Sequence, residues 1–210
     1  MLDSGADGDV IASGPPIIWQ PTPRQTEFLA CPDFEVLYGG AAGGGKSDGL
    51  LIDSWCFASG AHRNTNHRAV IFRKQFKDLI QLIERARSLF PQLMELDGIR
   101  YNQQTATFTT RQGAKLQFAH CANDAERFDW RGFAWNYIGF EELTLWATPL
   151  VYQYIKSRCR TTDRSLPRYV RATTNPDGPG QKWVMQHWGD RGSRSRDVAG
   201  VRTGLRRASG

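Results

Sequence analysis

VLYGGAAGGGKS, from Val36 to Ser47, is the stretch of the chain from which its fold can be predicted. Three apolar residues and Gly39 precede a full match to the pattern GxxxxGK[ST], which begins at Gly40. Glycines let the backbone turn around phosphate groups, and a helix that begins at the lysine adds partial positive charge from its first N–H groups. The stretch therefore predicts a strand, a phosphate-binding loop and a helix in succession. The predicted loop consists of Gly40, Ala41, Ala42, Gly43, Gly44, Gly45, Lys46 and Ser47.

The last two residues of this loop carry the chemistry. Lys46 is placed to reach the β and γ phosphates of a nucleotide, and Ser47 to offer its hydroxyl to the Mg²⁺ that bridges them. A glycine-rich strand-to-helix turn with an incidental lysine is the alternative without function. The order of strand, loop and helix favours the nucleotide site, so ATP and Mg²⁺ are the expected cofactors.

Short apolar runs alternate with helical stretches along the chain, as in an α/β domain with a largely parallel sheet. The predicted strands are Glu35–Tyr38, Ala69–Phe72, Lys115–Ala119, Tyr137–Phe140 and Tyr169–Thr173, and the predicted helices are Lys46–Ala58 and Gln75–Phe90. Arg100–Thr110 is predicted to form an antiparallel hairpin with Lys115–Ala119 around Gln112 and Gly113. The predicted fold class is α/β, a P-loop NTPase of the ASCE or RecA-like type, with a mainly parallel central sheet flanked by helices.

Composition limits the class of protein. Mean hydropathy is −0.50 and no run of 18 apolar residues occurs, so a membrane protein is excluded. The four cysteines lie far apart without metal-ligand spacing, which indicates reduced, mostly buried thiols rather than disulfides or a zinc site. Aspartates occupy the N-terminus where a signal peptide would need basic and apolar residues, so a cytoplasmic location is expected.

Charge and composition divide the chain into three parts. Residues 1–16 are rich in Gly, Asp and Ser and are predicted to be a flexible leader, followed by a globular domain over residues 17–188. Residues 1–150 carry a net charge of −3 and residues 151–210 one of +9. The last part, residues 189–210, is basic and lacks periodicity, which predicts a disordered tail or an attraction to polyanions such as nucleic acid.

An acidic pair follows the strand predicted at Tyr137–Phe140. Glu141 and Glu142 would lie at the carboxyl end of that strand, beside the phosphate-binding loop. This arrangement is typical of a strand that holds Mg²⁺, followed by a glutamate that polarises the attacking water. On this interpretation Glu141 holds the metal through water and Glu142 is the catalytic base. A solvated helix cap is the alternative.

Small polar residues end the strand predicted at Tyr169–Thr173. Thr173, Thr174 and Asn175 would face the ligand crevice, because that crevice lies at the carboxyl ends of parallel strands. Asn175 is a candidate for sensing the γ-phosphate, and the two threonines are candidates for relaying its loss. Thr-Asn-Pro is also a common way to begin a turn.

Taken together, these motifs resemble the N-terminal ATPase domain of the tailed-bacteriophage terminase large subunit. The resemblance covers roughly residues 17–188. It rests on PTPRQTEFL from Pro21, YGGAAGGGKS from Tyr38, IFR from Ile71, WRG from Trp130, GFEELT from Gly139 and TNPDGPG from Thr174. Both the order and the spacing of these motifs match the family.

The resemblance implies an ATP-driven motor that moves double-stranded DNA through a portal protein into a procapsid. It further implies the terminase small subunit as a partner, a homo-oligomeric ring on the portal, and the host cytoplasm as location; a monomer is the alternative for the isolated chain. Gln25 would contact the adenine, with Phe28 packing nearby, and Thr173 to Asn175 would couple hydrolysis to movement.

Such a motor stabilises charge on the transferred phosphate with an arginine from the same or a neighbouring subunit. Arg73 ends a predicted strand, and Arg131 precedes a glycine in a predicted loop, so both are candidates. Either arginine could instead bind a carboxylate or the DNA backbone.

Two departures from the family bear on activity. The family normally has aspartate where this chain has Glu141, which is one methylene longer and is expected to impair turnover more than binding. A complete large subunit also contains an acidic nuclease centre, whereas Asp190 and Asp197 are the only carboxylates after residue 188. The sequence therefore predicts no nuclease activity and indicates an ATPase fragment, a truncated gene product or one part of a split motor.

Other functions stay open. A catalytically weak nucleotide-binding module for regulation or assembly would bind ATP without steady phosphate release. A DNA helicase would need a second motor lobe, and a small-molecule kinase would need an arginine-rich lid and an acceptor pocket; the sequence indicates neither.

Overall fold

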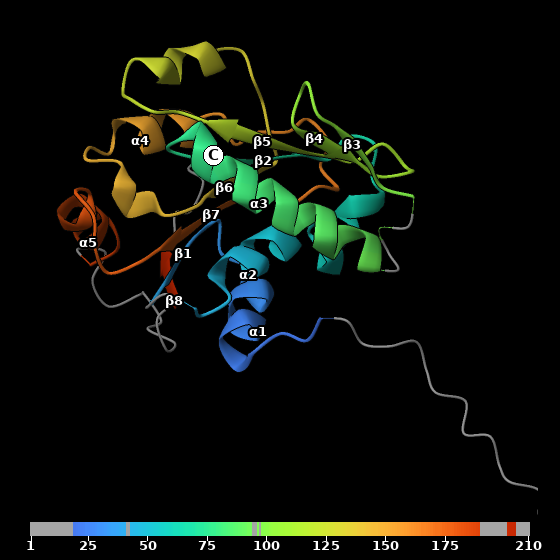
Figure 1. Ribbon diagram of the computed structural model, residues 1–210, viewed down its shortest axis with the longest axis horizontal. Coiled ribbons are helices and arrows are strands. Elements are labelled where there is room, and N and C mark those ends of the chain that lie inside the picture. The colour runs from blue at the N-terminus through green and yellow to red at the C-terminus, as the bar shows by residue number, and fades with distance from the viewer. Residues whose placement is uncertain (1–18, 41–42, 94–95, 97, 190–200, 205–210) are drawn as a thin grey trace, which may run out of the picture.

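The computed structural model describes residues 19–40, 43–93, 96, 98–189 and 201–204, and within them the chain forms an eight-stranded sheet with helices on both faces (Figure 1). The strands are β1 Glu35–Gly39, β2 Arg68–Arg73, β3 Arg100–Asn102, β4 Thr107–Thr109, β5 Lys115–His120, β6 Tyr137–Phe140, β7 Tyr169–Thr174 and β8 Val201–Gly204. The helices are α1 Pro23–Ala30, α2 Lys46–Asp53, α3 Phe76–Leu89, α4 Leu150–Lys156 and α5 Gln181–Gly189.

Five neighbouring strands form the parallel centre of the sheet, in the order β5, β2, β6, β7, β1. The antiparallel strands β4 and β3 extend it beyond β5, and β8 pairs antiparallel with β1 at the other edge. The prediction of a mainly parallel α/β sheet is confirmed. The predicted hairpin is confirmed for Thr107–Thr109, which pairs with β5 across a turn where Gly113 is left-handed (φ +93°). It is wrong for Arg100–Asn102, because the chain reverses at residues 103–106, where Ala106 has a φ of +47°, and Arg100–Asn102 pairs with β4 instead.

The central strands are apolar on both sides because both sides are covered. Along β1, Val36 and Tyr38 pack under α1, α2 and α3, whereas Leu37 points to the opposite face. That second face is covered by α4 and α5, through residues such as Val151 and Trp188. The result is a three-layer molecule in which the central strands are covered on both faces.

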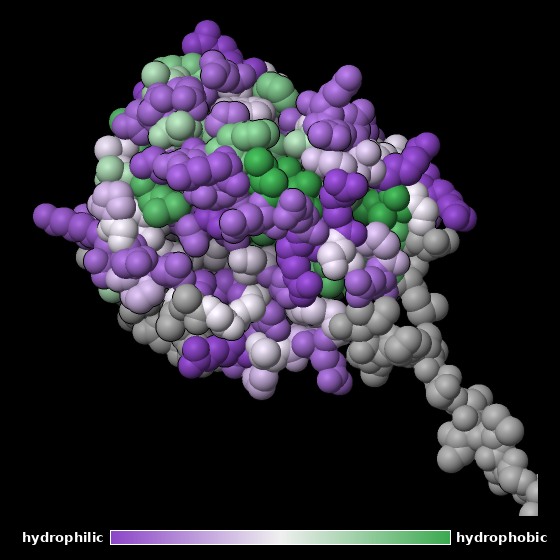
Figure 2. Space-filling view, viewed as in Figure 1, coloured by the Kyte–Doolittle hydropathy of each residue, from purple (hydrophilic) through white to green (hydrophobic). Residues whose placement is uncertain are grey.

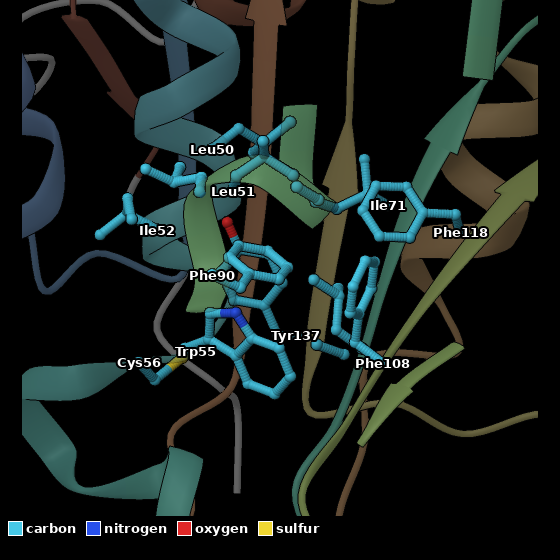
Figure 3. Packing of buried hydrophobic residues seen from close by; sticks show 14 of the residues in the cluster. Leu50, Leu51, Ile52, Trp55, Cys56, Ile71, Phe90, Phe108, Phe118 and Tyr137 are labelled. Carbon is cyan, nitrogen blue, oxygen red and sulfur yellow. The ribbon is translucent and has the colours of Figure 1, made fainter. Parts of the chain in front are cut away.

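A row of aromatic rings fills the core on the α2 and α3 side (Figure 3). Trp55 packs edge-on against Phe90 at 5.5 Å between ring centroids, Phe90 against Phe108 at 5.0 Å, and Phe108 against Phe118 at 5.8 Å. Trp55 and Phe90 follow the ends of α2 and α3, and Phe108 and Phe118 lie in β4 and β5. The aromatic row thereby joins the edge hairpin to the rest of the core.

The outer surface on this side of the molecule is mostly hydrophilic, with separate hydrophobic patches (Figure 2). Leu79, Leu82 and Ile83 of α3 are buried, whereas Phe76 and Ile80 are 56% and 44% exposed. Packing therefore explains only the buried part of the apolar stripe that the sequence shows on this helix. Among the described helices, none is both long and apolar enough to cross a lipid bilayer.

Besides the division of Arg100–Thr110 into β3 and β4, the structure differs from the predicted elements in two places. The helix predicted over Lys46–Ala58 ends at Asp53, because Cys56 adopts a left-handed φ of +47°, through which a right-handed helix cannot continue. Residues 201–204 form β8, although the basic tail over 189–210 was predicted to be disordered. The predicted leader at 1–16 and the rest of that tail, apart from Gly189 at the end of α5, lie outside the described residues.

Candidate functional site

The loop between β1 and α2 is held from two sides. The carbonyl of Gly45 accepts a hydrogen bond from Gln25 Nε2 at 2.7 Å, and the carbonyl of Gly44 accepts one from the Tyr38 hydroxyl at 3.2 Å. Gly45 is also the N-cap of α2, with φ +66°, and a Cβ there would lie 2.5 Å from Gln25 Nε2. Glycine is therefore needed for this close approach. Residues 41 and 42 of the loop lie outside the described part.

Gln25 acts in this structure as a link between α1 and the loop. Its Oε1 accepts a hydrogen bond from the backbone N–H of Thr22 at 2.8 Å, and the Thr22 hydroxyl in turn accepts one from the Gln25 N–H. This reciprocal pair is a capping box. Both ends of the Gln25 amide thus have partners within the chain, and its predicted contact with adenine stays a prediction. Phe28 packs nearby as expected, fully buried against Tyr38.

Lys46 lies at the first position of α2 with its ammonium group inside the loop. Its Nζ donates to the Gly40 carbonyl at 3.0 Å, and the residue is only 9% exposed. Burial lowers the pKa of Lys46, while the carboxylates of Glu142 and Glu141 act in the opposite direction. The ammonium group therefore lies in a desolvated loop whose helix N-terminus already favours anions.

Ser47 and Glu141 are brought together although they are far apart in the sequence. The Ser47 hydroxyl donates to Glu141 Oε1, and Glu141 is 2% exposed. One hydroxyl and one carboxylate in contact form the hard-oxygen donor set that fits Mg²⁺, which takes its remaining ligands from waters and phosphates. Among the described residues, no group of three or more His, Cys, Asp or Glu side chains could hold a metal by itself.

Arg73 joins the two glutamates. Its Nε lies 2.7 Å from Glu141 Oε2, and its NH1 donates to Glu142 Oε2. Burial raises the pKa of Glu141, and the Arg73 guanidinium is the largest opposing cause. The arginine thus favours the ionised carboxylate on which metal binding depends. Of the two candidate arginines, Arg73 is the one that the structure brings into the site.

Glu142 has an unusual backbone conformation. It adopts φ +54° and ψ +55°, the left-handed region, at a cost of about 1 kcal/mol or more for a residue with a side chain. Its backbone N–H donates to the Thr173 hydroxyl at 3.3 Å. The proposed catalytic base and the first threonine of the predicted coupling motif are therefore in direct contact.

The end of β7 is tied to the turn that follows Glu142. The hydroxyls of Thr174 and Thr144 lie 2.9 Å apart, and the Gly180 N–H donates to the Thr144 carbonyl at 2.7 Å. A Cβ at Gly180 would lie 2.0 Å from the Trp146 carbonyl oxygen, so this contact requires glycine. A shift of Glu142 would consequently reach the start of α5 through a short series of contacts.

Asn175 lines a largely apolar cleft of about 410 Å³ beside the loop, together with Gly39, Gly40 and Arg24. Its side chain is half-buried, and its carbonyl accepts a hydrogen bond from Thr174. The structure places Asn175 next to the start of the loop, as the sequence predicted, and its contact with a γ-phosphate stays a prediction. Arg24 was not singled out from the sequence, because nothing near it marks a ligand.

Arg131 lies apart from these groups. It is exposed and follows the short helical segment Glu126–Trp130, with its guanidinium 5.8 Å from the centre of the Phe128 ring. Within the described residues it forms no ion pair with Glu141 or Glu142. The stabilisation of phosphate charge by Arg131 stays a prediction, and it would require Arg131 to reach the phosphate from this exposed position.

A buried ionic group under α2 was missed by the sequence analysis. Arg171 in β7 is fully buried, and its Nε donates to Asp53 Oδ2 at 3.0 Å. Tyr137 donates to the same carboxylate oxygen at 3.0 Å, and two backbone carbonyls accept from the other Arg171 nitrogens. The sequence did contain a signal for this group, because Arg171 is a charged residue within an otherwise apolar predicted strand, two residues before Thr173.

Comparison with solved structures places the fold. The large terminase of a thermophilic bacteriophage is 17% identical with a TM-score of 0.60, over 82% of this chain and 43% of that one. The large terminase ATPase domain of Thermus phage P74-26 is 10% identical with a TM-score of 0.52, over 76% of this chain and 66% of that one. This chain thus spans less than two thirds of each. Neither a protein-family model nor a curated protein matches the sequence.

Proposed function

We propose that this chain, which has the fold of phage large-terminase ATPase domains, hydrolyses ATP to drive double-stranded DNA into a procapsid. The observation that carries the proposal is the convergence of Lys46, Ser47, Glu141 and Glu142 at one edge of the sheet. These groups supply a phosphate-binding cation, a metal-binding pair and a carboxylate base. The similarity of the fold to large-terminase ATPase domains supports a DNA-packaging motor over other P-loop enzymes.

In the proposed reaction, the loop N–H groups and Lys46 bind the phosphates of ATP at the N-terminus of α2. Ser47 and Glu141 would hold Mg²⁺, which supplies charge neutralisation at the β and γ phosphates. Glu142 would orient a water for in-line attack on the γ-phosphorus and accept its proton. Arg73 contacts Glu142 through one oxygen, Oε2, and so fixes the direction in which the carboxylate points.

Thr173 and Thr174 would couple ATP hydrolysis to movement of the rest of the domain. Any displacement of the Glu142 backbone acts on the Thr173 hydroxyl directly and, through Thr144, on the start of α5. DNA, the portal protein, a small subunit and neighbouring copies in a ring are the partners that this role requires. They are part of the proposal, as is the host cytoplasm as its location.

Steady-state phosphate release from Mg-ATP tests the proposal. Lys46→Ala should abolish turnover and weaken nucleotide binding, whereas Glu142→Gln should lower turnover by about 10²-fold to 10⁴-fold and leave binding intact. Lys77→Ala, which removes an exposed lysine of α3, is the matched control and should behave as wild type. Equal turnover in Glu142→Gln and wild type would show that Glu142 is not the base.

A second candidate function is a nucleotide-binding module without steady turnover. The observation that favours it is the pairing of Arg73 with both glutamates, which holds the base and the metal ligand in one ionic group. Such a module would bind Mg-ATP and lose that binding in Lys46→Ala, yet release no phosphate even with DNA and portal present. Phosphate release that accelerates on assembly would exclude it.

A further inference from the structure

The segment between α4 and β7, residues 157–168, lies at the amino ends of the parallel strands, at the far end of the sheet from Glu141 and Glu142 (Figure 1). Arg160, Arg164 and Arg168 in this segment are exposed. None of the three takes part in an ion pair within the part of the chain that the structure describes. The segment therefore presents a net positive charge to solvent.

Asp163 is the one carboxylate of this segment, and it offsets only one of the four arginine charges that residues 157–168 carry. Asp163 Oδ2 accepts hydrogen bonds from the amides of Asn64 and Asn66, both at 3.0 Å, and Oδ1 accepts one from the Ser165 hydroxyl at 2.6 Å. These neutral donors fix the loop in place and occupy the carboxylate. The three arginines stay available to an external anion.

Two polar hollows extend the surface across the sheet end. One has a volume of about 380 Å³ and is lined by Arg160, Thr161 and Thr162, and the other has a volume of about 340 Å³ and is lined by Lys115 and several threonines. Arg68 lines both, so the hollows adjoin. Neither lining contains a carboxylate. We call the two hollows with Arg164 and Arg168 the amino-edge basic surface.

The side chains of this surface fit one class of ligand. Arginine and lysine together with threonine hydroxyls and amides are the groups that bind the phosphates of a nucleic-acid backbone. A single strand would require exposed aromatic rings for base stacking. The aromatic residue in either lining is Trp135, which is 4% exposed and therefore closed to a base.

We propose that the amino-edge basic surface binds the phosphate backbone of double-stranded DNA without reading its sequence. The inference deepens the proposed motor function and rests on it for the choice of DNA over RNA. The surface lies at the opposite edge of the sheet from the nucleotide groups, so DNA bound there leaves the phosphate-binding loop accessible to ATP.

Fluorescence anisotropy with a labelled DNA duplex of mixed sequence tests the surface in the full chain. The test variant is Arg160→Gln with Arg164→Gln. The matched control is Lys77→Gln with Lys182→Gln, which removes the same charge from exposed positions on α3 and α5. The test variant should bind the duplex about tenfold more weakly than the control, with the slope of log affinity against log salt reduced by about 1 per lost contact.

Several outcomes would overturn the inference. Equal duplex binding by the two double variants would place the contact elsewhere. Equally tight binding of a single strand of the same sequence would mean that the backbone of a duplex is not the ligand, and displacement by polyglutamate at equal charge would indicate an acidic protein partner. Phosphate release is measured on the same variants. If wild type and both double variants release no phosphate, yet the test variant still binds the duplex more weakly than the control, the proposed ATPase function is refuted. The inferred DNA-binding surface is then still supported.

Discussion

At the carboxyl edge of the sheet, Arg73 determines the charge environment of both glutamates of the candidate site. Sixty-nine residues separate it from Glu142, yet it touches both carboxylates of the site. Without it, the buried carboxylate of Glu141 would keep the negative charge of Glu142 as a neighbour but lose the guanidinium that offsets it, and the pKa of Glu141 would rise.

We expect Arg73→Gln to shift the acid limb of turnover to higher pH. Burial already raises the pKa of Glu141 and Arg73 lowers it, so removal of the guanidinium raises this pKa further and protonates the metal ligand at a higher pH. The measurement is the pH profile of phosphate release, or of Mg-ATP binding if turnover is too slow. Lys74→Gln is the control, because Lys74 donates to the Leu145 carbonyl and to neither glutamate. An acid limb unchanged from wild type would contradict the expected effect of the pairing.

Comparison of Gly45→Ala with Gly43→Ala distinguishes two causes of lost stability in the loop, the strain of a positive φ and the steric contact of a new Cβ with Gln25. Both positions have positive φ, so each substitution should cost about 1 kcal/mol of stability or more. Only at Gly45 does the added Cβ meet Gln25 Nε2, at 2.5 Å, whereas nothing lies within 4 Å of it at Gly43. Gly45→Ala should therefore be the more destabilising by urea denaturation, and a second substitution, Gln25→Ala, should reduce that excess. Equal losses at both glycines would contradict this account.

At the scale of elements, the buried pair under α2 connects the nucleotide-binding helix to β7. Arg171 and Asp53 lie in the interior, where breaking an ion pair leaves one charge without compensation. The same strand carries Thr173, so the pair fixes the position of α2 relative to the predicted coupling motif.

We expect Arg171→Leu to lower the free energy of unfolding by about 3 to 5 kcal/mol, because Asp53 is left unpaired. The double variant with Asp53→Leu should recover part of this loss. In the single variant the pKa of Asp53, already raised by burial, should rise further, so the loss should shrink as the pH falls and the carboxyl takes up a proton. Urea denaturation at two pH values measures both effects. A double variant no more stable than the single one would show that the pair itself is not the cause.

The five central strands and the helix at Gln75–Phe90 could be predicted because each is a local pattern, an apolar run or a 3.6-residue period. The loop could be predicted because its chemistry depends on neighbouring residues. The Arg73 pairing and the Arg171–Asp53 pair depend on contacts between strands and helices distant in sequence, which no local pattern records. β8 was missed because Val201–Gly204 stands in a glycine- and arginine-rich stretch without alternation.

At the scale of the whole molecule, a histidine makes stability depend on pH. His67 is fully buried, with Nε2 2.9 Å from the Ser54 carbonyl and Nδ1 3.0 Å from Asn136 Nδ2. Burial lowers its pKa from 6.5 to about 4. The unfolded chain therefore takes up a proton at a higher pH than the folded one does.

We expect the free energy of unfolding to fall as the pH decreases from about 6.5 to about 4, by about 3 kcal/mol from this group alone. Above pH 6.5 the contribution of His67 should be constant. His67→Gln removes the titrating group, so its stability, whatever its value at pH 7, should decline less steeply with acid. Urea denaturation of both proteins from pH 7 to pH 4.5 gives the two slopes. Parallel slopes would mean that His67 titrates alike in the folded and unfolded chain.

The position of β1 in the sheet also has a consequence for how the chain acquires its structure. β1 is made early, yet its neighbours are β7 and β8, with Glu35 opposite Val170 and Gly204. During synthesis this strand therefore has no partner until the ribosome has passed residue 174, and its hydrogen-bonding edges stay open to other chains meanwhile. Such distant pairings make folding slow. The strand that leads into the phosphate-binding loop is thus among the last to be completed, and the period before its closure is when the nascent protein is most exposed to aggregation.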